Sequence, residues 1–117
     1  MTNFLFILND APYGSERSYN GLRLAGALAR REGSIMHVFL MGDAAACARK
    51  GQSLPVGYYS IETMPGKLRR RDSEVAVYGT CMDARGLEEN ELIAGRHRST
   101  LGSLADWTDS SDQILVF

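Results

Sequence analysis

The chain has 117 residues, of which 44% are hydrophobic and 23% charged, which is typical of one globular domain covering residues 1–117. Its 13 basic and 14 acidic residues give a net charge of -1. That balance argues against direct nucleic-acid binding and against a membrane-surface protein, because both need excess positive charge. No segment approaches the roughly 20 apolar residues that span a bilayer, so no membrane partner is predicted.

The first half of the chain predicts two buried strands, each followed by a helix. Nearly continuous apolar runs cover residues 3–8 and 35–40, which is the pattern of strands covered on both faces of a sheet. The first helix is expected to begin at Ser15, whose hydroxyl can bind an unpaired amide of the first turn. The second is expected over residues 44–50, with Asp43 as its cap.

The second half is less regular. In order, we expect a surface loop at 52–64, a short helix at 65–71, a strand at 74–78, a final helix beginning at Ser99 or Thr100, and a last strand at 113–117. Residues 92–94 fit either a very short strand or the end of a helix. The basic cluster at 67–71 fits either a solvated helix face or a contact with a partner.

Alternating strands and helices with short connections predict an α/β fold. The sheet should be mostly parallel, with four or five strands and helices on both faces. Ligands of such sheets bind outside the carboxyl ends of the strands. The segments that leave the first three strands, 9–14, 41–43 and 79–86, should therefore gather at one edge.

The cysteine pattern indicates free thiols in a reducing compartment. Cys47 and Cys81 are far apart and form no C-x-x-C, and the first residues lack the basic region of a signal peptide. We therefore expect a cytoplasmic protein. The cysteines and the two histidines show no zinc-binding spacing, and the common nucleotide-binding fingerprints are absent, so neither a metal nor a cofactor is predicted.

Cys81 is the candidate nucleophile. It follows a predicted strand and a glycine that permits a sharp turn, where successive backbone amides can form an anion-binding concavity. If a helical turn begins here, Arg85 lies one turn away on the same side, and Asp83 either opposes its effect or orients it. The alternative is that Cys81 is a small apolar core residue. Cys47 lies among alanines, which favours a structural role.

Other residues at the same edge are candidates for a pocket beside Cys81. They are Asn9, Asp10, Tyr13, Gly42, Thr80, Met82, Asp83 and Arg85. Asn9 and Asp10 also fit a turn that their side chains stabilise, and Tyr13 fits packing better than a ligand contact. His37 lies in mid-strand, in the core or against a partner, and His97 is expected to be exposed.

Six segments together resemble the DsrE-like family of sulfur-relay proteins. They are 9–14 (Asn-Asp-Ala-Pro-Tyr-Gly), 41–43 (Met-Gly-Asp), 50–52 (Lys-Gly-Gln), 78–86 (Tyr-Gly-Thr-Cys-Met-Asp-Ala-Arg-Gly), 104–107 (Leu-Ala-Asp-Trp) and 111–117 (Ser-Asp-Gln-Ile-Leu-Val-Phe). The resemblance implies a single-domain, Rossmann-like three-layer fold that assembles into homotrimers or homohexamers. It also implies that Cys81 accepts a persulfide sulfur from a donor protein and passes it to an acceptor protein. The chain looks closer to the stand-alone members of the family.

Three functions are consistent with these features. The first is a sulfur carrier or sulfurtransferase that uses Cys81 and requires no cofactor. The second is a non-catalytic oligomeric module whose pocket beside Cys81 holds a small anion or a nucleotide-like ligand. The third is a structural subunit that supports a partner through its oligomer surface.

Overall fold

The residues that the structure describes form one all-parallel sheet of five strands, in the order β4-β3-β2-β1-β5. This computed structural model describes residues 2–51 and 73–117. The strands are β1 (Thr2–Leu8), β2 (Ser34–Leu40), β3 (Glu74–Tyr78), β4 (Arg96–Ser99) and β5 (Gln113–Val116). The predicted α/β fold with a mostly parallel sheet of four or five strands is confirmed.

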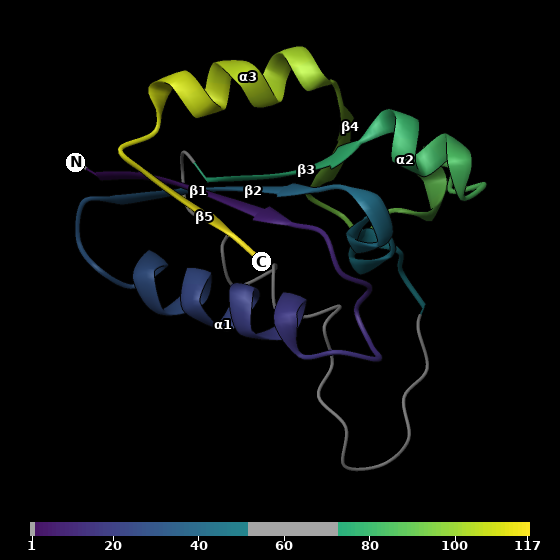
Figure 1. The fold of residues 1–117 in the computed structure, drawn as a ribbon, viewed down its shortest axis with the longest axis horizontal. Coiled ribbons are helices and arrows are strands. Elements are labelled where there is room, and N and C mark those ends of the chain that lie inside the picture. Colours follow the sequence, from purple (N-terminus) through teal and green to yellow (C-terminus); the bar gives the residue numbers. More distant parts are fainter. Residues whose placement is uncertain (1, 52–72) are drawn as a thin grey trace.

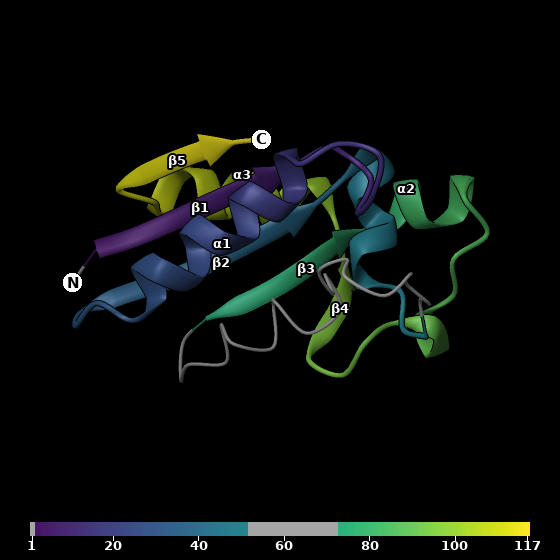
Figure 2. The same cartoon turned by 90° about the horizontal axis from the view of Figure 1, so that it is seen from below.

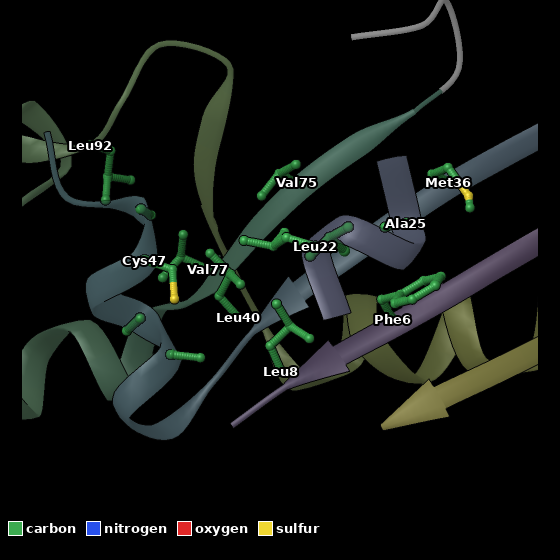
Figure 3. Close-up of a cluster of buried hydrophobic side chains, with 14 of the residues drawn as sticks. Phe6, Leu8, Leu22, Ala25, Met36, Leu40, Cys47, Val75, Val77 and Leu92 are labelled. Atoms are coloured by element: carbon green, nitrogen blue, oxygen red, sulfur yellow. The ribbon is translucent and has the colours of Figure 1, made fainter. Parts of the chain in front are cut away.

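The central strands are buried on both faces, as their apolar runs predict. Along β1, Phe6 faces a cluster on one side of the sheet while its neighbour Leu5 faces a cluster on the other, because successive side chains of a strand alternate. The larger cluster joins Phe6 to Leu40 of β2 and Val77 of β3 (Figure 3). Full burial of each such side chain contributes about 1.5–3 kcal/mol to stability.

Two helices cover the two faces and complete the three layers (Figure 1). Helix α1 (Arg17–Ala29) lies against the larger cluster and buries Leu22 and Ala25. Helix α3 (Leu101–Ser110) covers the opposite face with Leu104 and is capped by Thr100, whose hydroxyl accepts a hydrogen bond from the Ser103 amide at 3.2 Å. The expected start of the final helix is thus confirmed.

Two expected helix starts are wrong. Ser15 does not cap α1, because its hydroxyl donates a hydrogen bond to the Asp10 carboxylate at 2.8 Å and the helix begins at Arg17. The helix expected over 44–50 is the 3₁₀ helix η1 (Gly42–Ala48). Asp43 lies inside η1, and its side chain binds Arg85 instead of capping the helix.

Strand β4 was not expected from the sequence. Its four residues, Arg96–Ser99, are polar because the strand lies at an edge of the sheet, where little hydrophobic burial is available. His97 lies on this strand and is exposed, as expected, 3.7 Å from the Glu74 carboxylate. Residues 92–94 follow the end of the short 3₁₀ helix η3 (Glu89–Glu91), which Leu92 caps, and Leu92 also forms an isolated antiparallel bridge with Arg49.

The loop expected at 52–64, the helix expected at 65–71 and the basic cluster at 67–71 lie outside the described residues. Within residues 2–51 and 73–117, no helix combines the length and the apolar character needed to cross a membrane.

Candidate functional site

The three segments that were expected to gather at the carboxyl edge of the sheet meet there. Helix η1 follows β2, and the short helix α2 (Gly79–Ala84) follows β3 without an intervening loop. Both lie at the end toward which the strand arrows point (Figure 2). The segment after β1 joins them, since the Asn9 carbonyl accepts a hydrogen bond from the Ala44 amide at 3.3 Å.

Gly79 lies where the chain turns from β3 directly into α2, and its missing side chain serves close packing rather than a left-handed conformation. Its backbone is not in the left-handed region. A Cβ atom at this position would lie 2.7 Å from the Cζ atom of Arg98. The missing side chain therefore leaves room for the Arg98 guanidinium beside the start of α2.

The sulfur of Cys81 accepts a hydrogen bond from the backbone amide of Gly42, with 3.2 Å between N and Sγ. Cys81 is the third residue of α2 and is half-buried, packed against the larger core cluster. A hydrogen bond from an amide stabilises a charged sulfur more than a neutral thiol, and so does the start of a helix. The contact therefore places one fixed backbone donor on the sulfur of Cys81.

Gly42, which donates to Cys81, also has a backbone conformation that favours glycine. Its φ is 56°, in the left-handed region that glycine adopts without steric cost. A Cβ atom here would lie 3.3 Å from the Asn9 carbonyl oxygen. The glycine after β2 thus turns the chain into η1, while its amide donates to Cys81.

Arg85 binds the backbone of Cys81 rather than its sulfur. Its Nη1 donates to the Cys81 carbonyl oxygen at 3.2 Å. Its Nη2 and Nε donate to the Oδ1 atom of Asp43 at 2.8 Å and 3.2 Å. The guanidinium therefore joins α2 to η1.

Asp83 does not orient Arg85, because it is paired with Arg98. The two nitrogens Nη1 and Nη2 of Arg98 donate to the two carboxylate oxygens at 2.7 Å and 2.8 Å. The hydrogen bonds from Arg98 lower the pKa of Asp83, and the same bonds raise the pKa of Arg98. The negative charge of Asp83 is thus balanced on the side of α2 that faces β4.

The other pocket candidates separate into turn, core and surface residues. Asn9 donates from Nδ2 to the Phe117 carbonyl at 3.3 Å, and Asp10 accepts from Ser15, so both hold the turn after β1. Tyr13 is partly buried against the core, Met82 is fully buried in it, and Thr80 is exposed. Among the candidates, Gly42 and Arg85 are the two that contact Cys81 by hydrogen bonds.

Cys47 is fully buried in the larger cluster, in agreement with the structural role expected for it (Figure 3). Burial raises the pKa of its thiol from about 9.0 to about 12. The two cysteines therefore differ in environment, since Cys81 is half-buried and receives an amide hydrogen bond. Across residues 2–51 and 73–117, no three His, Cys, Asp or Glu side chains gather as they would around a metal ion.

Sequence reasoning missed two residues of this region. Asp43 was expected to cap a helix, yet it binds Arg85. Arg98 was not singled out, because the strand that carries it was not recognised. The glycine before Cys81 was the available signal for Arg98, since a glycine at a strand end can leave room for a neighbouring side chain as well as permit a turn.

The comparisons with known proteins agree with the fold. The model of the DsrE/DsrF-like family matches residues 2–117. Protein YchN of Escherichia coli K12 is 40% identical over 118 residues, covering 100% of both chains, and the uncharacterized protein MK0008 of Methanopyrus kandleri is 33% identical over 95% of this chain and 90% of its own. The crystal structure of the E. coli ychN protein superimposes with a TM-score of 0.92 over 100% of both chains, at 40% identity.

Proposed function

Because this chain belongs to the DsrE/DsrF-like family, we propose that it is a sulfur carrier or sulfurtransferase that holds a persulfide on Cys81. The observation that carries the proposal is the hydrogen bond from the Gly42 amide to the Cys81 sulfur, 3.2 Å long. A carrier cysteine must be charged when it attacks and must hold a charged terminal sulfur afterwards. The Gly42 amide is a fixed donor from which a charged sulfur on Cys81 can accept a hydrogen bond.

The reaction is an exchange of one sulfur atom between thiols. The Cys81 thiolate attacks the outer sulfur of a donor persulfide, a new S–S bond forms at Cys81, and the donor's own S–S bond breaks. The donor cysteine leaves as a thiolate with the electron pair of that bond, and it takes up the proton that Cys81 gave to solvent. In the second step an acceptor nucleophile attacks the outer sulfur, and Cys81 leaves as a thiolate.

No external oxidant or reductant is needed, because the transferred sulfur keeps its oxidation state in both steps. The proposed setting is the cytoplasm, where thiols stay reduced, and both cysteines of this chain are free thiols. The donor and acceptor are proposed to be proteins that present a persulfide or a nucleophile to the carboxyl edge of the sheet.

We also propose that the protein works as a homo-oligomer, a trimer or a hexamer. Support comes from strand β5, which lies at the edge of the sheet and exposes two aliphatic side chains, Ile114 and Val116, at 44% and 64%. Edge strands of monomers usually carry charges or proline, which prevent pairing with another chain. Association would cover this apolar edge.

A second function, binding of a small anion or nucleotide-like ligand without sulfur transfer, is favoured by one feature. A groove of about 400 Å³ lies at the start of α2, lined by Thr80 of that helix but not by Cys81. Its described lining residues are Tyr78, Gly79, Thr80, Glu89, Arg98, Ser99, Thr100 and Leu101. Saturable binding of inorganic phosphate or AMP in calorimetry, lost in Arg98→Gln, together with a Cys81 that accepts no sulfur, would favour this function.

Sulfur acceptance tests the carrier proposal directly. The purified protein is incubated with polysulfide, or with a cysteine desulfurase and cysteine, and its intact mass is measured by mass spectrometry. The carrier function predicts a gain of one sulfur atom in the unmodified protein and in Cys47→Ala, and no gain in Cys81→Ala. Circular dichroism spectra of the variants check that they are folded. No gain in any sample, or an equal gain in both variants, would contradict the proposal.

A further inference from the structure

Cys81 and its hydrogen-bond donor come from segments that are distant in sequence. Gly42 opens η1 and Cys81 lies in α2, 39 positions later. The N–H···S contact therefore depends on how η1 and α2 lie against each other. A displacement of about 1 Å between two such segments can change reactivity by about 100-fold in a preorganised site.

Arg85 connects η1 and α2 by binding Asp43 and Cys81. Asp43, which binds Nη2 and Nε of Arg85, directly follows Gly42 in the chain. The Cys81 carbonyl, which accepts from Nη1, belongs to the residue that carries the sulfur. One guanidinium thus fixes the residue next to the amide donor and the backbone of the acceptor residue at the same time.

The charge of Arg85 is poorly placed to act on the sulfur. The Asp43 carboxylate lies 2.8 Å from Nη2 and offsets the positive charge, and the donor aimed at Cys81 reaches the carbonyl oxygen. A planar guanidinium is suited to bridging because its donors point in fixed directions, whereas a lysine ammonium is a compact charge that cannot bind both partners in this way.

We propose that Arg85 is a positioning residue, which holds the Gly42 amide on the Cys81 sulfur by binding Asp43 and the Cys81 carbonyl together. The benefit for persulfide transfer rests on the proposed function, but the positioning does not. The effect is moderate, because the side chains of Arg85 and Asp43 are 37% and 69% exposed and exposed ion pairs are weak.

The test compares variants that separate charge from bridging. The rate of Cys81 alkylation by the neutral reagent iodoacetamide is measured at pH 7.5, with amide hydrogen exchange at Gly42 followed by NMR spectroscopy. Arg85→Lys keeps the charge but loses the bridge, so alkylation should slow roughly three- to tenfold, as in Arg85→Gln, and exchange at Gly42 should accelerate. Asp43→Asn keeps the acceptor oxygen but weakens the bond, so it should slow alkylation less than Asp43→Ala, which should slow it like Arg85→Gln.

A role of Arg85 through its charge predicts the opposite pattern. In that case Arg85→Lys would keep the parent rate, and Asp43→Asn would alkylate faster because the balancing carboxylate is gone; either result would overturn the proposal. Asp43→Ala combined with Arg85→Gln should be no slower than either change alone, because both break the same bridge. Purely additive slowing would also count against it.

The same variants distinguish this inference from the proposed function. If the parent protein accepts no sulfur in the mass experiment but the alkylation and exchange pattern holds, the carrier function is wrong and the positioning is right. If all Arg85 variants accept sulfur and alkylate at the parent rate, the positioning is wrong and the carrier function stands.

Discussion

The amide of Gly42 points at the sulfur of Cys81 across 3.2 Å, from a backbone with φ of 56° that a residue with a side chain rarely adopts. The two properties meet in one residue, which donates to Cys81 through its amide and turns the chain from β2 into η1 through its left-handed backbone. The glycine of this turn is thus part of the thiol's environment as well as part of the chain's path.

The change Gly42→Ala should therefore lower both stability and thiol reactivity. Left-handed backbone costs alanine about 1–2 kcal/mol, and the new Cβ would lie 3.3 Å from the Asn9 carbonyl oxygen. We expect a lower melting temperature and slower alkylation of Cys81. The matched control is Gly14→Ala, which has φ of 102° and no atom within 4 Å of its Cβ position. It should lose stability but keep the alkylation rate, and equal slowing in both variants would refute the link.

Gly79→Ala should break the ion pair between Arg98 and Asp83. The Cβ would lie 2.7 Å from the Arg98 Cζ, so the flexible arginine must move away. The pKa of Asp83, which Arg98 lowers, should then rise to its ordinary value. Carboxyl chemical shifts in an NMR titration measure this, and Arg98→Gln should give the same titration curve for Asp83. An unchanged low pKa of Asp83 in Gly79→Ala would mean that Arg98 keeps its place.

The pH dependence of this pair follows from the sign of the shift. Because the folded pKa of Asp83 is lowered from 3.8, its stabilising effect is present above that pH and is lost as the pH falls below it. The difference in stability between the parent protein and Arg98→Gln should thus disappear in acid, and it should be small throughout, because the pair is exposed.

The sequence was most informative where burial dominates. Strands β1, β2 and β3 are apolar runs because both faces of the sheet are covered. Their positions can therefore be predicted from these runs of apolar residues in the sequence. Strand β4 was missed because an edge strand such as Arg96–Ser99 needs backbone pairing and little burial, and its polar side chains resemble those of a loop.

The candidate site was predictable in location but not in its contacts. The rule for carboxyl ends of parallel strands brought Asn9, Gly42 and Cys81 to one edge. The partners of Arg85 and Asp83 were not predictable, because each carboxylate had an arginine within reach only after the fold joined distant segments. Thus Arg85 binds Asp43, which is 42 positions away in the sequence, and not Asp83, the partner considered from the sequence.

The proposed oligomer predicts a specific effect at β5. Val116→Lys and Ile114→Lys place charges on the exposed apolar edge and should reduce the mass measured by light scattering to that of a monomer. Leu101→Lys is the matched control, because Leu101 is 55% exposed but lies on α3. It should leave the assembly intact. A monomeric parent protein, or dissociation by Leu101→Lys alone, would contradict an interface at β5.

The buried thiol of Cys47 should make the protein sensitive to alkaline pH. Its pKa rises from about 9.0 to about 12 on folding, because burial disfavours the thiolate. Above the unfolded value the unfolded chain gives up this proton and the folded chain keeps it, so the folded state binds more protons and loses stability as the pH rises. The contribution of the neutral Cys47 thiol to the free energy of unfolding is fully present below pH 9 and falls by about 1.4 kcal/mol per pH unit until the folded pKa is reached.

Urea unfolding at pH 8, 9, 10 and 11 measures this loss of stability. Other groups titrate in the same range, so the comparison is with Cys47→Ala, which lacks the thiol and should lose less stability over these pH values. Parallel curves for the two proteins would mean that folding leaves the pKa of Cys47 unchanged.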